Sequence, residues 1–150
     1  MWKASNDERL VKWQKLRNHI SSLPLDKALE EVAEIWAQAP FKTYFLNFEN
    51  SKEWPDPWSL IIEPRFCDIA KCLGIIYTIY FTSYRNTIEL ELRIYQDTNK
   101  CQLYALVFVN SGQYILNYYS GEIVNIQQIQ EKELQLIYQY TIADLELEKY

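Results

Sequence analysis

The stretch EPRFCDIAKCLG at residues 63–74, followed by IIYTIYFT at 75–82, decides the predicted fold. In the first stretch, apolar residues recur at i, i+3, i+4 and i+7, which is typical of a helix buried along one side. Those positions are Phe66, Ile69, Ala70 and Leu73. Pro64 suits the first turn of a helix, and Gly74 suits the position just after its end. We therefore predict a helix that carries Cys67 and ends at Gly74.

Four segments after this helix have the composition of β-strands. The first, 75–82, is almost entirely apolar and rich in β-branched and aromatic residues, as a central strand is. In the second, 87–95, apolar and polar residues alternate. The third and fourth are 102–109 and 113–119, and NSG at 110–112 predicts a hairpin turn between them. We therefore expect the cysteine helix to pack on an antiparallel sheet of about four strands.

Helices are predicted on both sides of this core. Apolar spacing indicates helices at about 6–22 and 26–38, which form an N-terminal helical hairpin. Two pairs with capping-box spacing, Asn125 with Gln128 and Thr141 with Asp144, predict C-terminal helices. The fold class is therefore α+β. We expect a single domain over residues 1–150, with the hairpin at 1–40, a helix-and-sheet core at 54–119 and the C-terminal helices at 125–150.

The composition excludes several classes of function. A net charge of −5 argues against nucleic-acid binding, which needs a clustered positive surface. Basic residues near the N-terminus are interleaved with Asp7 and Glu8, so we expect them on the solvent-exposed face of the first helix. They are Lys3, Arg9, Lys12, Lys15 and Arg17. No apolar run reaches the roughly 18 residues of a membrane helix, so no membrane partner is expected.

The cysteines bear on compartment and cofactors. Cys67, Cys72 and Cys101 are odd in number and irregular in spacing, and the N-terminal sequence MWKAS begins no secretory signal. We therefore expect reduced thiols in a cytoplasmic setting. One histidine and three scattered cysteines do not supply the four ligands of a zinc site, and we expect no metal and no other cofactor.

The sequence WPDPW at 54–58 predicts a rigid turn, because each proline fixes its own φ near −65°. The turn presents two indoles, Trp54 and Trp58. Indoles usually bury most of their area, which favours a hydrophobic plug over the core. A ligand-binding platform is the alternative, and it makes these two residues candidate binding residues.

Cys67 is the candidate nucleophile of the chain. Unpaired N–H groups near a helix start favour the thiolate, and Lys71 lies one turn further on the same side. Cysteine catalysis also needs a base within hydrogen-bond reach. No histidine follows Cys67, and the only histidine, His19, lies on the first predicted helix, where a surface or helix-capping role is expected.

Residues 54–117 resemble the core of the transglutaminase-like cysteine proteins. The resemblance is carried by WPDPW at 54–58, FCDIA at 66–70, LG at 73–74, LYALVFV at 103–109 and GQYILN at 112–117. In that family a Cys-Asp or Cys-Glu pair opens a helix packed on an antiparallel sheet, a histidine begins the next strand, and an aspartate ends the strand after it. Here Tyr104 falls at the histidine position and Asn117 at the aspartate position. Since tyrosine, with a pKa near 10, is a poor base at neutral pH, the resemblance implies a vestigial or altered site at Cys67, Tyr104 and Asn117.

The whole chain also resembles a family of small tailed-phage proteins to which no activity is attached. The matching segments are APF at 39–41, WPDPW at 54–58, CDIAKCLG at 67–74 and YILN at 114–117. This resemblance implies a phage origin and a place in the virion or in the cytoplasm of the infected host.

Three functions follow as hypotheses. The first is a non-enzymatic pseudoenzyme that acts as a virion neck or tail component, within an oligomeric assembly, or as a host-factor binder. The twelve tyrosines favour this protein–protein interaction role. The second is a cysteine-dependent hydrolase or acyltransferase that uses Cys67. The third is a small-ligand-binding antagonist of host defence. The sequence contains no glycine-rich phosphate loop that would support this hypothesis.

Overall fold

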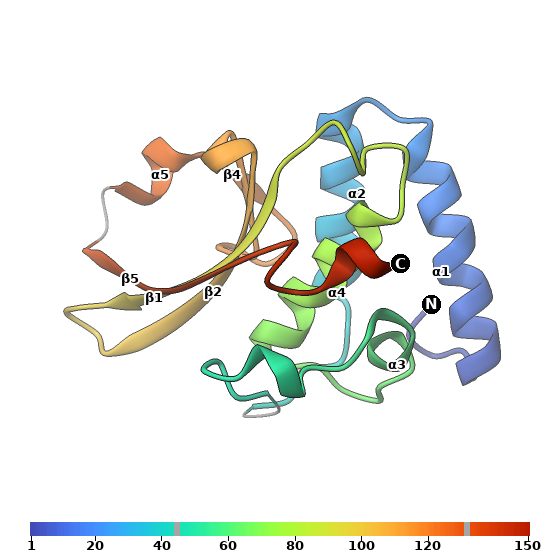
Figure 1. Ribbon diagram of the computed structural model, residues 1–150, viewed down its shortest axis with the longest axis horizontal. Helices are drawn as coiled ribbons and strands as arrows, with labels where there is room; N and C mark the ends of the chain where they lie inside the picture. Colours follow the sequence, from blue (N-terminus) through green and yellow to red (C-terminus); the bar gives the residue numbers. More distant parts are fainter. Residues whose placement is uncertain (44–45, 131–132) are drawn as a thin grey trace.

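The computed structural model describes residues 1–43, 46–130 and 133–150. Most helices gather on one side of the molecule and a single antiparallel sheet lies on the other (Figure 1). The helices are α1 (Asn6–Ser21), α2 (Leu25–Ala37), α3 (Pro57–Ile61), α4 (Asp68–Tyr80) and α5 (Ile126–Gln130), with 3-10 turns η1 (Ser51–Glu53), η2 (Asn110–Gly112) and η3 (Leu147–Lys149). The strands are β1 (Leu90–Asp97), β2 (Gln102–Val109), β3 (Tyr114–Leu116), β4 (Ile123–Val124) and β5 (Leu134–Thr141). The predicted α+β class is confirmed. Within the described ranges, no helix is long and apolar enough to cross a membrane.

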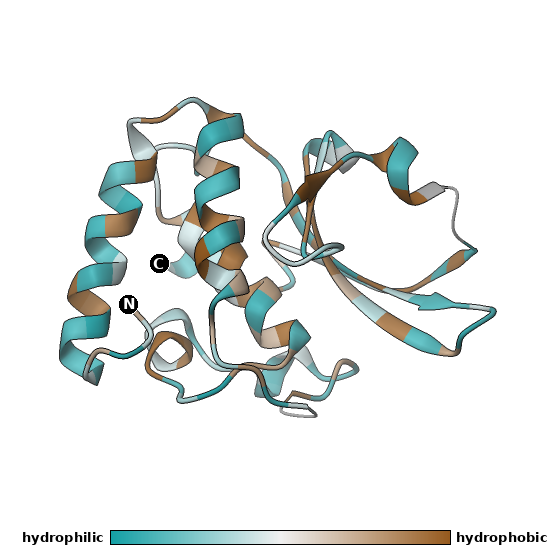
Figure 2. Cartoon of the chain, turned by 180° about the vertical axis from the view of Figure 1, so that it is seen from behind, coloured by the Kyte–Doolittle hydropathy of each residue, from teal (hydrophilic) through white to brown (hydrophobic). Residues whose placement is uncertain are grey.

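The predicted N-terminal helices are confirmed as α1 and α2. Along both, hydrophilic and hydrophobic positions alternate (Figure 2), and most of the apolar ones pack inward, with Val11 of α1 left exposed. Ser5 caps α1 through its hydroxyl, and Pro24 precedes α2. Arg9 corrects one expectation: it is buried rather than on the solvent-exposed face, because its guanidinium donates to main-chain carbonyls. The acceptors are the oxygens of Trp2, Ile61 and Glu63.

The central helix α4 differs most from the prediction. It begins at Asp68 rather than at residue 63, and it continues to Tyr80 through a stretch predicted as a strand. Every residue from Ile69 to Tyr80 is buried. A helix that is apolar on all sides lacks the 3.6-residue periodicity, so its second half has the composition of a central strand. Gly74 therefore lies inside the helix rather than just beyond its end.

Thr78 joins α4 to the N-terminal hairpin. Its Oγ1 accepts hydrogen bonds from the indole N–H groups of Trp13 (2.9 Å) and Trp36 (3.1 Å). The Thr78 hydroxyl in turn donates to the carbonyl oxygen of Gly74 (2.6 Å). These bonds satisfy two buried indoles at a single side chain, which fixes how α1 and α2 pack on α4.

The sheet has five antiparallel strands in the order β4-β3-β2-β1-β5. β2 has the predicted bounds, whereas β1 begins at Leu90 rather than at residue 87. β3 is shorter than the predicted 113–119, because Asn117 adopts a φ of 72° and leaves the extended conformation. The stretch at 75–82 is not in the sheet, and the two strands that were not predicted, β4 and β5, form its two edges.

The C-terminal region corrects the prediction of helices over 125–150. Asn125 and Gln128 do form reciprocal hydrogen bonds and open α5, but this helix is short. The chain then forms β5 at the opposite edge of the sheet, since its sequence LQLIYQYT suits a strand. Thr141 and Asp144 form their predicted reciprocal bonds in a turn after β5 instead of at the start of a terminal α-helix.

Each face of the sheet has its own apolar layer. On the helix side, Ala105, Val107 and Val109 of β2 join the main core around α4. On the far side, Leu106 and Phe108 form a second cluster with residues of β3, β4 and α5. Strand alternation thus determines which side chains of β2 lie on the same side of the sheet as Cys67.

Candidate functional site

Cys67 lies at the junction between an extended segment and α4. It is the N-cap residue of the helix, and its Sγ accepts a hydrogen bond from Ala70 N–H (3.4 Å). The preceding residue, Phe66, is held by main-chain bonds to Pro40 and Lys42 (2.8 and 2.9 Å). The sequence predicts Cys67 about one turn inside the helix. This prediction is wrong, because Cys67 lies just before the first helical residue. The side chain is only 6% exposed, and its sulfur serves as a helix cap.

A pocket of about 510 Å³ opens beside Cys67. Phe41 and Phe48 of the segment before α3 form one wall, and Leu103 and Ala105 of β2 form another. Most of the lining is apolar, and the volume falls within the roughly 300–1,000 Å³ of small-ligand sites. The cysteine therefore neither projects freely into solvent nor is sealed in the core.

Tyr104 does not face Cys67. Strand alternation places its side chain on the far face of the sheet, where it packs with the second cluster and stacks on Tyr118 at a centroid distance of 5.7 Å. The β2 residues that line the pocket are Gln102 and the two neighbours of Tyr104, Leu103 and Ala105. None of these side chains is a base at neutral pH. The predicted grouping of Tyr104 with Cys67 is thus not formed, because strand alternation turns the Tyr104 side chain to the far face of the sheet.

Asn117 contacts a different cysteine. Its Nδ2 donates to Sγ of Cys72 (3.3 Å) and to the carbonyl oxygen of Ala105 (3.0 Å). Burial raises the pKa of the Cys72 thiol well above its ordinary value, as does the charge of Asp68, while the Asn117 hydrogen bond lowers it. The sequence singles out Asn117 but offers no sign of this partner, because contacts between a helix and a sheet depend on the tertiary fold. Asn117 anchors the end of β3 to α4.

His19 lies on the surface of the helical hairpin, as expected. Its Nε2 lies 3.0 Å from a carboxylate oxygen of Glu31 on α2, and both side chains are exposed. The pair links α1 to α2 and offers no base to Cys67.

Two charged residues follow Cys67 in the first turn and a half of α4, Asp68 and Lys71. Desolvation raises the pKa of the Asp68 carboxyl, and the charge of Lys71 partly offsets this effect. Burial lowers the pKa of Lys71, whose ammonium lies 5.5 Å from the ring centroid of Phe41. Among the described residues, no group of three or more histidine, cysteine, aspartate or glutamate side chains has the arrangement of a metal site.

The two indoles of the proline-rich turn have different surroundings. Trp54 is buried, donates to the carbonyl oxygen of Asn47 (2.8 Å) and packs edge-on against Tyr140. Trp58 is 43% exposed and packs against Phe81 and Tyr150. Trp54 therefore covers the core, while Trp58 remains partly exposed at the surface.

A helix capped by cysteine that packs on an antiparallel sheet beside a pocket is the arrangement of a transglutaminase-like core. Solved structures of Legionella pneumophila LapG have this fold: one aligns with a TM-score of 0.69 at 15% identity, over 91% of this chain and 75% of LapG. EGTA-treated LapG gives 0.69 at 15% identity over 91% and 74%, and calcium-bound LapG gives 0.65 at 14% over 92% and 77%. No family model and no curated protein matches the chain. At these identities the likeness concerns the fold, and the predicted transglutaminase-like core is confirmed.

Proposed function

We propose that this chain is a non-catalytic, protein-binding variant of the transglutaminase-like fold that acts in a tailed phage. Its place is either the neck or tail of the virion or a complex with a host protein in the infected cytoplasm. The surroundings of Cys67 carry the proposal. The thiol is nearly buried and caps α4. The β2 side chains that line its pocket, Gln102, Leu103 and Ala105, have no titratable group, and Asp68 of α4 adds a carboxylate to the lining.

The surface of the molecule supports protein binding. Several large apolar side chains are more than a third exposed, and such residues are frequent in interfaces. They are Val11, Phe41, Trp58, Leu103, Tyr119, Leu136 and Tyr150. They belong to both the helical side and the sheet side, so the chain has contact area for more than one neighbour.

The test replaces Cys67 with serine in the phage gene. Serine keeps a side-chain acceptor for the N-cap and removes the nucleophilic thiol. We expect unchanged plaque yield, and recovery of the chain either in purified particles or in a complex with one host protein, equally for both forms. A folded Cys67→Ser protein that no longer supports phage growth contradicts the proposal.

A cysteine-dependent hydrolase or acyltransferase is the second candidate. It is favoured by the position of Cys67 at the start of a thirteen-residue helix and at the wall of an open pocket. Tyr104 is on the other face of the sheet, so such an enzyme needs a different base, for which Asp68 is the nearest carboxylate along the chain. Hydrolysis of p-nitrophenyl acetate by the wild type but not by Cys67→Ser would favour this candidate.

The third candidate, a small-ligand antagonist of host defence, is favoured by the volume of the same pocket. A ligand at 100 times its dissociation constant stabilises the folded state by about 2.7 kcal/mol. A thermal-shift screen of nucleotides, repeated with Ala105→Trp to fill the pocket, tests it.

A further inference from the structure

Strand β5 is an open edge of the sheet. It pairs with β1 on one side, and no other strand in the described ranges pairs with its second side. In Figure 1 it runs beside β1 and leads to the C-terminal turn. An unpaired edge presents a row of main-chain donors and acceptors, which a strand of another protein can extend.

The composition of β5 does not block this edge. Its eight residues, LQLIYQYT, contain no charge and no proline, two of the features by which natural sheets block an edge. One register shift opposite Ile94 and Tyr95 divides the strand into two short ladders. Leu136 is 41% exposed and adds an apolar contact next to the main-chain groups.

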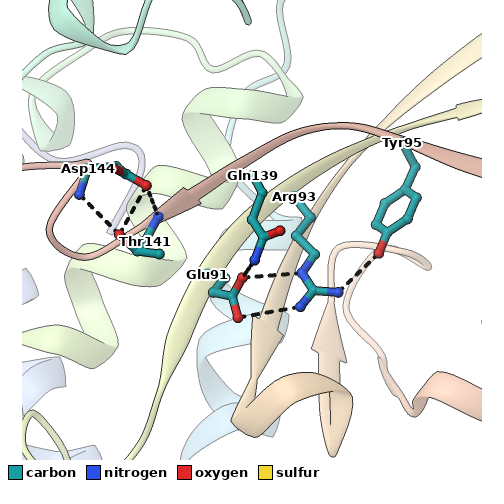
Figure 3. A network of polar contacts seen from close by, with 6 residues as sticks. All are labelled: Glu91, Arg93, Tyr95, Gln139, Thr141 and Asp144. Atoms are coloured by element: carbon teal, nitrogen blue, oxygen red, sulfur yellow. Dashed lines mark hydrogen bonds and ion pairs between the residues drawn. The ribbon is translucent and has the colours of Figure 1, made fainter.

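Contacts with β1 and with the segment before α3 hold β5 in place. Glu91 of β1 accepts a hydrogen bond from Gln139 of β5 and pairs with Arg93 (Figure 3). On the helix-side face of the sheet, Tyr138 packs on Phe48, and the Tyr140 hydroxyl donates to the carbonyl oxygen of Phe48 (2.7 Å). A rigid edge loses little conformational entropy when a partner strand binds.

Acidic residues stand at both ends of the uncharged strand. Glu133 precedes β5 and Asp144 follows it by one turn, and both are exposed. Each accepts a hydrogen bond from a threonine hydroxyl, from Thr98 and Thr141 respectively, which holds the carboxylates near the strand ends. An antiparallel pair of two β5 strands would bring Glu133 of one copy near Asp144 of the other, so like charges oppose self-association.

We propose that the free edge of β5 binds an extended segment of a partner protein, uncharged at its centre and flanked by lysine or arginine. Main-chain hydrogen bonds to β5 supply the docking, Leu136 supplies an apolar contact, and Glu133 and Asp144 select the basic flanks. This inference rests on the proposed protein-binding function and names the surface and the chemistry of the partner.

The test uses the full chain and a blocked peptide, KKTVTVTVKK, with EETVTVTVEE as the matched control. NMR amide exchange is measured residue by residue with each peptide. We expect the lysine-flanked peptide to protect amides within 134–141 and the glutamate-flanked peptide to bind at least tenfold more weakly. Protection elsewhere, equal binding of the two peptides, or no binding at millimolar concentration would overturn the proposal.

Variants on exposed positions complete the experiment. Glu133→Gln with Asp144→Asn keeps hydrogen-bond acceptors and removes both charges, and it should weaken the lysine-flanked peptide about fivefold, since each exposed ion pair contributes little. Leu136→Lys should abolish binding, whereas Val11→Lys on the exposed face of α1 should leave it unchanged. A dimer of the free wild-type chain that Leu136→Lys dissociates would show that a second copy, not a basic peptide, occupies the edge.

The two proposals fail in distinguishable ways. Absence of peptide binding with unimpaired phage growth of Cys67→Ser refutes the β5 edge alone. Loss of growth with Cys67→Ser refutes the non-catalytic function whatever the peptides do.

Discussion

The indole of Trp36 occupies the space where a β-carbon of residue 74 would lie. A β-carbon built on Gly74 would be 2.1 Å from Cη2 of the indole. Since α2 and α4 pack through this contact, the glycine sets how closely the N-terminal hairpin approaches the central helix. The same indole is also fixed by its hydrogen bond to Thr78.

Gly74→Ala should therefore destabilise the protein, although alanine is ordinarily preferred over glycine in a helix by about 1 kcal/mol. We expect a loss of about 2–3 kcal/mol in the free energy of unfolding, measured by urea denaturation, because the core must shift to admit the methyl group. In a double-mutant cycle with Trp36→Leu, the two losses should be clearly less than additive. An increase in stability of the single variant would refute the close contact.

Thr78→Val should also destabilise the protein, by about 2–4 kcal/mol, because two buried indole N–H groups lose their acceptor. Thr78→Ser keeps the hydroxyl and serves as the control, with a smaller loss. Equal losses for valine and serine would mean that the hydroxyl is not the common acceptor of Trp13 and Trp36.

Asp56 predicts a pH dependence. It caps α3 by accepting hydrogen bonds from the N–H and hydroxyl of Ser59 (2.9 and 2.7 Å). Desolvation raises the pKa of this carboxyl, but the hydrogen bonds outweigh it and leave the pKa below its ordinary value. A pKa lower in the folded than in the unfolded state means that the stabilisation is present above the unfolded pKa, near 3.9, and is lost as the pH falls through the folded one.

Asp56→Ala should accordingly cost about 1 kcal/mol at pH 7, and the difference from the wild type should shrink below pH 4. Asp56→Asn, which retains an acceptor, should show a smaller and flatter loss. A difference that grows as the pH falls would contradict the assignment.

The helix cap at Cys67 gives a prediction that distinguishes a structural role of this residue from a chemical role of its thiol. Cys67→Ala removes the acceptor of Ala70 N–H and should cost about 1 kcal/mol, whereas Cys67→Ser should be at least as stable as the wild type, since serine is a strong N-cap residue. Thermal unfolding of the three proteins side by side measures the difference. Equal stability of the alanine and serine variants would contradict the role of Cys67 as the N-cap of α4.

Local patterns predicted the elements whose periodicity is clean. The amphipathic spacing in α1 and α2, the run of β2 and the capping pair at Asn125 and Gln128 all have their expected structures. The second half of α4 and strand β5 were assigned wrongly, because an all-apolar helix resembles a strand and a capping pair at Thr141 forms in a turn as well as at a helix.

The candidate site was predictable only in part. Cys67 at a helix start beside a sheet follows from the residues and from the family resemblance. The face on which Tyr104 lies depends on strand register, and a shift of one residue reverses it. The contact of Asn117 with Cys72, the buried position of Arg9 and the acceptor role of Thr78 arise from tertiary packing, which no local pattern encodes.

The rate at which iodoacetamide alkylates each cysteine of the folded protein, followed by peptide mass spectrometry from pH 5 to pH 9, tests the non-catalytic role of Cys67 most directly. Cys101 is exposed, Cys67 caps a helix and Cys72 is fully buried with a raised pKa. We predict that Cys101 reacts fastest, that Cys67 follows well behind it, and that Cys72 reacts only on unfolding. Faster alkylation of Cys67 than of Cys101, with a rate that persists below pH 6, would reveal an activated thiolate and contradict this account.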